Sequence, residues 1–142
     1  MISFAPCHYN HFDYIKPLAV QSDEYRALWG PGYREGLLSG IALSAWASGV
    51  CVGAAGVFEP HAGRGEAWAL LGEGAGSYLL TIVRRMRFVL QTHPARRIDM
   101  LVTDGNGNGH VLAELCGFVY ETKLEAYHPS GRDAFMYKRM RQ

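Results

Sequence analysis

Residues 70–80 read LLGEGAGSYLL, in which three glycines at alternate positions separate two apolar runs. The run before them is rich in the small, aromatic and aliphatic residues that favour a strand. After them, apolar residues recur at helical spacing, at Leu79, Val83, Met86 and Leu90. This pattern predicts a strand, a glycine turn and a helix over 77–92. Such a turn is either a phosphate-binding loop, with bare amides at a helix N-terminus, or a plain change of direction.

Two further apolar runs precede this stretch. They read IALSAWASG and VCVGAAGVFE, and with GEAWALLG they form a series separated by Ser48-Gly49 and by HAGRG. Short β-rich runs joined by glycine turns predict an antiparallel meander of three strands. All three runs are more apolar than a half-exposed sheet needs, so we expect both faces to be covered.

The remaining elements are predicted from shorter signals. Upstream we expect a strand over 2–5, short helices over 8–18, 22–29 and 33–38, and a loop at Trp29-Gly30-Pro31-Gly32. Downstream we expect a strand over 98–102, a helix over 111–115 and two strands over 118–127 and 134–140. The strand-helix-strand unit requires parallel neighbours, whereas the meander is antiparallel. The fold class is therefore α+β, with a mixed, mostly antiparallel sheet of about seven strands and helices on both faces.

Composition excludes several classes of protein. The 142 residues include 14 Lys and Arg and 13 Asp and Glu, so the formal net charge is +1 and no one-signed field attracts nucleic acid or a membrane surface. Hydrophobic residues make up 49%, enough for one domain over 1–142. No apolar run approaches the ~20 residues of a membrane helix, and no secretory leader is evident. We therefore expect a cytoplasmic protein.

Cysteines and histidines give no sign of a metal centre. The three cysteines are an odd number without CxxC spacing, and the six histidines form no HxH or HxxxH pair. No metal ligand is predicted.

The element order and the glycines resemble the GNAT family of acetyl-CoA-dependent N-acetyltransferases. In that family the fourth strand leads into a loop of the form Q/RGxGxG/A, followed by a helix with an apolar start. Gly72, Gly74 and Gly76 take the glycine positions here, and Leu79-Leu80 takes the apolar pair. The resemblance covers about residues 41–140.

A second match is separate from the first. After the fifth strand the family shows a valine, an asparagine four residues later and a helix that closes on Gly-Phe. This sequence has Val102, Asn106 and Gly117-Phe118 at those separations.

The resemblance implies a coenzyme site. Acetyl-CoA would lie between the fourth and fifth strands, which splay apart in the family, with its pyrophosphate on the loop amides. The residues so implied are Leu70, Leu71, Gly72, Glu73, Gly74, Ala75, Gly76, Ser77 and Asn106.

Two positions depart from the family. Leu71 replaces the Arg or Gln that opens the loop, and Ala113 stands where many members have a tyrosine that protonates the departing thiolate. Another acid is then needed, and His110, Tyr120 and Cys116 are the candidates. The base that accepts the amine proton is expected to be Glu66, or Glu59 as an alternative. Each also has a plain structural interpretation: Glu66 as a solvated turn carboxylate, and His110 as the start of a helix.

Two functions from different classes remain open. One is an acetyl-CoA-dependent N-acetyltransferase in which an amine of a small molecule or protein attacks the thioester directly. The other is a catalytically weak or inactive GNAT-like domain with a binding role, since the chain also looks similar to short GNAT-like proteins of tailed phages, some of them virion-associated. The last strand, AFMYKRM, would offer an edge for a homodimer.

Overall fold

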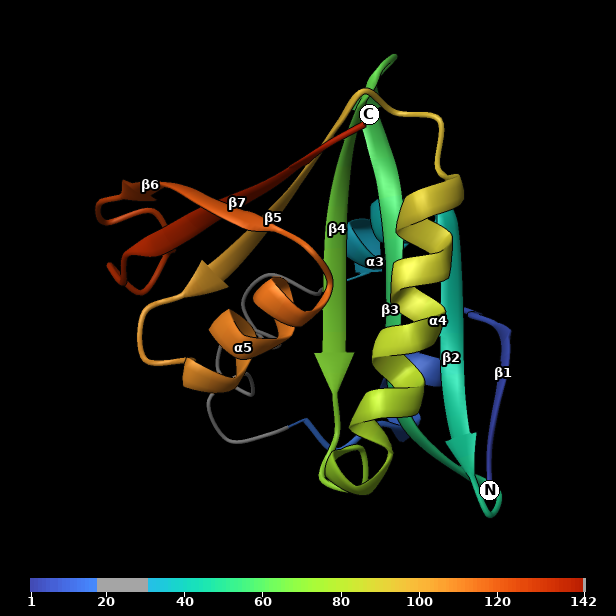
Figure 1. Ribbon diagram of the computed structural model, residues 1–142. Coiled ribbons are helices and arrows are strands. Elements are labelled where there is room, and N and C mark those ends of the chain that lie inside the picture. Colours follow the sequence, from blue (N-terminus) through green and yellow to red (C-terminus); the bar gives the residue numbers. More distant parts are fainter. Residues whose placement is uncertain (18–30, 142) are drawn as a thin grey trace. The chain divides into compact units, whose positions relative to one another are not determined.

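The computed structural model describes residues 1–17 and 31–141 (Figure 1). The chain divides into two compact units, Met1–Phe58 with Trp68–Ile82, and Glu59–Ala67 with Val83–Gln142. The expectation of a single domain over 1–142 stays a prediction.

The first unit is built on an antiparallel meander. Strands β1 (Ile2–Pro6), β2 (Ile41–Ala47) and β3 (Val50–His61) pair in sequence, with Ile2 opposite Ala47 and Ala47 opposite Val50. The β2–β3 turn consists of Ser48 at φ 50° and Gly49 at φ 80°. Two consecutive residues with positive φ give the tight turn whose twist matches that of the strands. The predicted turn at Ser48-Gly49 is therefore confirmed.

Two short helices close the core of this unit. They are α1 (His11–Tyr14) and α3 (Pro31–Leu37), whose Phe12 and Leu37 are 0% and 1% exposed. Both side chains pack with Trp68 and Leu70, which come from the strand that precedes the glycines. His11 also bonds the buried Ser44 hydroxyl on β2, with 2.8 Å between Nδ1 and Oγ.

The predictions for the N-terminal helices need correction. The helix expected over 8–18 is only His11–Tyr14, because Lys16 precedes Pro17 and such a residue is driven to extended backbone, as Ile15 already is at ψ 129°. The loop expected through Pro31 and Gly32 is wrong there: both lie in α3. Proline suits the first turn of a helix, where its missing amide proton has no partner to lose. The helix expected over 22–29 lies outside the described residues.

Strand β4 (Arg64–Leu71) is followed by the glycine stretch, a 3₁₀ turn η1 (Gly76–Tyr78) and helix α4 (Leu79–Thr92). The helix predicted over 77–92 is confirmed, although its first turn has the tighter 3₁₀ geometry. On α4, Val83 and Leu90 are buried, whereas Arg84, Arg85 and Arg87 are exposed, as the spacing of apolar residues predicts.

The second unit completes a mixed sheet. Strand β5 (Arg97–Thr103) runs parallel to the first half of β4, from the Arg64–Arg97 pair to the Ala67–Met100 pair. Strand β7 (Ala134–Met140) pairs antiparallel with β5 and with β6 (Val119–Leu124), as Figure 1 shows. The order of the seven strands is β1-β2-β3-β4-β5-β7-β6, so the predicted mixed, mostly antiparallel sheet is confirmed. The edge expected at AFMYKRM is wrong, because β7 has a neighbour on each side.

Helix α5 (Gly107–Leu115) begins four residues earlier than expected and has a defined end. Asn106 caps its start by accepting a hydrogen bond from the Gly109 amide at 3.0 Å. At its end, the Phe118 amide bonds Ala113 and the Gly117 amide bonds Glu114, with Gly117 at φ 89°. This Schellman arrangement needs a residue that tolerates a left-handed backbone, so it explains why the helix closes on Gly-Phe.

Within residues 1–17 and 31–141, no helix has both the length and the apolar character that crossing a membrane requires.

Candidate functional site

The glycine stretch uses part of its hydrogen-bonding capacity inside the protein. The Gly72 amide donates to Val52 at 2.7 Å, the Glu73 amide to Lys16 at 3.1 Å, and the Ala75 amide to Gly72 at 3.1 Å. The Gly72 position also forms a bridge with Pro17. Three of the amides that the sequence assigned to a phosphate therefore hold the loop in place instead.

The other three amides of the stretch, those of Gly74, Gly76 and Ser77, have no hydrogen-bond partner among the described residues. They stand at the start of the η1–α4 segment, where the helix N-terminus carries partial positive charge. A Cβ added at Gly76 would meet nothing within 4 Å, so the backbone there is open to an approaching group. These three donors form an anion-binding candidate.

The side chains of residues 70–76 differ in burial and in what they can offer a ligand. Leu70 is 1% exposed and belongs to the hydrophobic core, so it can offer a ligand only its backbone. Leu71 is half-buried and supplies no polar group at the loop entrance. The Glu73 side chain is exposed, as are Gly74 and Gly76. Gly74 packs close to Val52: a Cβ there would lie 2.9 Å from a Val52 methyl.

Asn106, the last residue that the resemblance assigned to the coenzyme, has a structural partner. Its side-chain oxygen caps α5 by accepting from the Gly109 amide. Gly109 can come this close because it has no side chain: a Cβ there would lie 2.7 Å from the Asn106 side-chain nitrogen. The asparagine therefore fixes where α5 begins.

Two predicted catalytic residues lie in one aromatic cluster. His110 of α5 bonds Tyr137 of β7, with 2.5 Å between Nδ1 and Oη. Tyr120 of β6 packs edge-on against Tyr137, with 5.8 Å between ring centroids, and both His110 and Tyr120 contact the ring of Phe135. The structure thus brings together two residues that lie apart in the sequence, with Tyr137 as the link between them.

Two residues near the C-terminal end of α5 are inaccessible to solvent. Ala113 and Cys116 are both 0% exposed. Burial raises the pKa of the Cys116 thiol to about 11, although Arg87 and Arg139 act in the opposite direction. Cys116 is therefore a protonated, inaccessible core residue and is removed from the candidate acids.

Glu66 lies on the other face of the sheet. It is opposite Asp99 on β5, and Asp99 is opposite Lys138 on β7, whereas Tyr137 is opposite Met100. Because neighbouring residues of a strand point to opposite faces, the carboxylate of Glu66 and the hydroxyl of Tyr137 are on different sides. The structure does not join Glu66 to the aromatic cluster.

The face that carries Glu66 is an ion-pair network. Asp99 is 2% exposed and accepts from Arg64 at 2.7 Å and from Arg97 at 2.6 Å. Arg97 also pairs with Glu121, which lies 3.6 Å from Lys138. Desolvation raises the pKa of Glu66, nearby Arg64 opposes the shift, and the Asp99 carboxylate adds to it. These surroundings therefore make Glu66, the first-ranked candidate for the base, more basic than an ordinary glutamate.

Glu59, the alternative base, is exposed at the far end of β3. Its carboxylate lies 3.9 Å from His93 Nε2, at the distance of a weak ion pair.

Tyr137 is not among the catalytic residues that the sequence predicts. The period-two alternation of AFMYKRM places it on the same face as Phe135, and that alternation is the signal that could have found it. Its pairing with His110 depends on where α5 packs, which no local pattern contains.

Comparisons with known proteins identify the fold. The sequence matches no protein-family model and no curated protein. Among solved structures, an acetyltransferase of the GNAT family from Streptococcus pneumoniae is similar at a TM-score of 0.69 and 13% identity, covering 100% of both chains. A putative phosphinothricin N-acetyltransferase has a TM-score of 0.71 at 15% identity, covering 100% of this chain and 99% of that one. A putative acetyltransferase from Salmonella typhimurium, solved with its cofactor acetyl-CoA, has a TM-score of 0.72 at 11% identity, covering 100% and 95%. The chain therefore has the GNAT acetyltransferase fold.

The environment of Glu66 gives a testable dependence of stability on pH. Because its folded pKa lies above the ordinary value of 4.5, the folded state holds the proton more tightly than the unfolded state does. Ionising Glu66 therefore costs stability as the pH rises from 4.5 through the folded pKa. We expect the free energy of unfolding of Glu66→Gln to improve relative to wild type as pH rises from about 4 to 7, measured by urea denaturation.

Exposed Glu73→Gln serves as the control, and its difference from wild type should change little over the same range. A Glu66→Gln profile parallel to wild type would show that the surroundings of this carboxyl do not favour its neutral form.

Proposed function

We propose that this protein is an acetyl-CoA-dependent N-acetyltransferase of the GNAT family, with a single catalytic domain over 1–142. The observation that carries the proposal is the set of open amides at Gly74, Gly76 and Ser77, at the start of a helix that follows a strand in a GNAT fold. Similarity over the whole chain to acetyltransferases, one of them solved with acetyl-CoA, supports the same assignment.

The open amides suit the diphosphate of coenzyme A. Backbone N–H groups at a helix N-terminus donate to phosphate oxygens, and the helix dipole adds favourable charge. Gly76 lets the backbone approach the oxygens because nothing projects from it. The internal bonds of Gly72, Glu73 and Ala75 hold the loop in one shape, which lowers the entropy cost of binding.

The proposed reaction is direct acyl transfer. The amine nitrogen attacks the thioester carbonyl, a C–N bond forms, and the C–S bond breaks to release the thiolate of coenzyme A. The amine loses a proton to a base and the thiolate gains one from an acid. Since these two protons move at different atoms, Glu66 as base and His110 as acid can act from opposite faces of the sheet.

His110 is suited to the acid role by its partner. The form that can protonate the thiolate is the imidazolium, in which both ring nitrogens carry a proton. Nδ1 then donates to the Tyr137 oxygen, and the proton on Nε2 is the one that can be given to the thiolate. Burial raises the pKa of Tyr137, so its hydroxyl stays neutral and accepts that hydrogen bond. Tyr137 is then a positioning residue that orients the imidazole ring. The tyrosine missing at Ala113 is replaced by a group one turn earlier on the same helix.

The alternative is a GNAT-like domain that binds without catalysis, including a virion-associated role. The observations that favour it are the bonded amides of Gly72 and Glu73 and the buried alanine at position 113. Under this alternative, acetyl-CoA neither stabilises the protein nor is consumed.

The acceptor is proposed only as an amine of a small molecule or protein. Nucleic acid and membrane lipid are not expected partners, given the net charge of +1, and we propose a cytoplasmic location. If a homodimer forms by strand pairing, it must use β1 or β6, the strands at the two ends of the sheet order.

Coenzyme binding is tested by Gly76→Val. Wild type should gain about 2.7 kcal/mol of stability when acetyl-CoA is present at ~100 times its dissociation constant. A valine at position 76 has room in the folded protein but projects where the phosphate must come, so the variant should fold and lose that gain. Thermal denaturation with and without acetyl-CoA measures both quantities.

The matched control is Gly36→Val, since Gly36 also has nothing within 4 Å of an added Cβ and lies outside the loop. It should keep the gain. Equal stabilisation of Gly76→Val and wild type would show that the amides do not hold the diphosphate, and no gain for wild type at millimolar coenzyme would favour the alternative.

The acid is tested by comparing His110→Gln, Tyr137→Phe and Tyr120→Phe. Release of the coenzyme A thiol would be followed with a panel of polyamines, amino acids and lysine peptides. We expect His110→Gln to lower kcat about a hundredfold, at the lower end for general acid catalysis because a thiolate leaves readily, with KM for acetyl-CoA little changed. Tyr137→Phe should cost less and alter the pH profile.

Tyr120→Phe should turn over like wild type, because among the described residues its hydroxyl has no hydrogen-bond partner. A large loss in Tyr120→Phe with a normal His110→Gln would transfer the acid role to Tyr120.

A further inference from the structure

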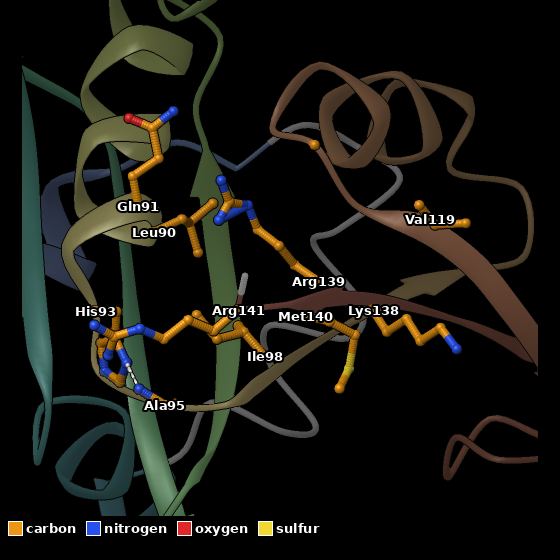
Figure 2. A pocket seen from close by; sticks show the side chains of 11 residues that line it. Leu90, Gln91, His93, Ala95, Ile98, Val119, Lys138, Arg139, Met140 and Arg141 are labelled. Atoms are coloured by element: carbon orange, nitrogen blue, oxygen red, sulfur yellow. Dashed lines mark hydrogen bonds between the residues drawn. The ribbon is translucent and has the colours of Figure 1, made fainter.

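The second unit contains a pocket that the proposed reaction does not use. Its volume is about 620 Å³. It lies between the last turn of α4, the turn after α5 and the end of β7, and Figure 2 shows the 11 side chains that line it. None of them belongs to the glycine loop or to the His110–Tyr137 cluster.

The lining is unusually positive for a chain with nearly balanced charge. Lys138, Arg139 and Arg141 are among the lining residues, and no Asp or Glu is. The Lys138 side chain points to the opposite face of β7 from Arg139, as Figure 2 shows, and its ammonium lies 3.6 Å from Glu121. Arg139 and Arg141, by contrast, have no carboxylate within 4 Å among residues 1–17 and 31–141. Within the described part of the chain, these two guanidinium groups of the lining therefore have no carboxylate partner.

Arg139 is the better placed of the two. It is half-buried, and its side chain extends from β7 toward Leu90 in Figure 2, whereas Arg141 extends toward His93. A Cβ added at Gly117 would lie 3.5 Å from the Arg139 Nε, so the guanidinium sits above the turn that ends α5. A guanidinium presents parallel N–H donors in one plane, which favours a planar, two-oxygen anion.

The rest of the lining is mixed. Leu90, Ala95 and Ile98 form its apolar part and are 4%, 3% and 3% exposed, whereas Gln91 and His93 are polar. His93 is turned toward the backbone, where its Nδ1 accepts from the Ala95 amide at 3.1 Å, as the dashed line in Figure 2 marks. An apolar floor beside an unpaired cation is the combination that recognises an anion attached to a hydrophobic body.

We propose that this pocket binds a small organic acid, with its carboxylate on Arg139 and its apolar part against Leu90 and Ile98. Arg141 adds positive field but is not required to touch the ligand. A phosphate ester on an apolar body shares the recognised chemistry, so the experiment compares the two. The inference rests on the pocket alone and holds whether or not the chain transfers acetyl groups.

The rival explanation is structural. Cationic side chains near the C-terminus of a helix stabilise its negative end, and α4 ends beside Arg139 and Arg141. In that case the arginines contribute to stability and the pocket takes no ligand.

The experiment titrates the full chain with sodium benzoate, with phenyl phosphate, with the neutral analogue benzamide and with acetate. Chemical shifts of the backbone amides of Ala95 and Gly117 and of the Arg139 Nε–H report occupancy of the pocket. For benzoate we expect saturable shifts with a dissociation constant on the order of 1 mM, as ligand efficiencies of small molecules imply. Benzamide should not bind, and acetate should bind more weakly because it lacks the apolar body. Tighter binding of phenyl phosphate would assign the site to phosphate esters.

The decisive variant is Arg139→Gln, with Arg132→Gln in the β6–β7 loop as the control. Arg139→Gln should weaken benzoate binding about tenfold or more, since it removes a charge-assisted contact, whereas Arg132→Gln should bind as wild type does. The proposal is overturned if benzoate causes no saturable shift in wild type, or if both variants bind equally well. Loss of thermal stability in Arg139→Gln without any benzoate binding by wild type would establish the structural explanation. If Arg139→Gln fails to fold, Leu90→Ala provides a second variant, which must weaken benzoate more than acetate.

Discussion

The proposed chemistry of this protein depends on backbone amides that the fold leaves without partners. A helix cannot satisfy the N–H groups of its own first turn, so a chain that enters a helix must bond them elsewhere or leave them to water or a ligand. This protein does both at one turn. It bonds Gly72, Glu73 and Ala75 internally and leaves Gly74, Gly76 and Ser77 open. The first set gives the turn its shape, and the second is the set that we propose binds the diphosphate of coenzyme A.

The second unit meets a different constraint, the burial of charge. Asp99 is nearly inaccessible on a strand with neighbours on both sides, and two arginines satisfy it. The same pairing draws Arg97 toward Glu121 and leaves Glu66 in a partly desolvated position. On the opposite face the α5 caps set the position of His110, and through it the contact with Tyr137. The two faces of one small sheet thus differ: one carries a carboxyl group of raised pKa, and the other carries the hydrogen-bonded pair of His110 and Tyr137.

Much of the fold follows from local sequence signals. Alternation and glycine turns predict β2, β3 and β4, helical spacing predicts α4, and Gly117 marks the end of α5. The errors are also local in origin. The glycines around Pro31 predict a loop, although proline suits the first turn of a helix, and Pro31 lies in α3. The run AFMYKRM predicts an edge strand because the order of strands cannot be obtained from the run itself.

The site was less predictable than the fold. The glycine spacing located the loop, but which amides remain open depends on Val52 and Lys16, which are distant in sequence. His110 and Tyr120 were selected as nearby donors, and their shared contact with Tyr137 arises from packing between α5, β6 and β7. The unpaired arginines of the pocket were not foreseen, since a basic residue near a strand end has no distinctive spacing.

The decisive experiment is a titration of isotope-labelled protein with acetyl-CoA, followed by amide NMR. If the open amides bind the diphosphate, the Gly74, Gly76 and Ser77 signals shift saturably, and coenzyme A without its acetyl group gives the same shifts because the diphosphate is the part that they hold. If those three signals stay in place while millimolar coenzyme is added, the open amides do not bind the diphosphate, and the proposed acetyl transfer loses its physical basis.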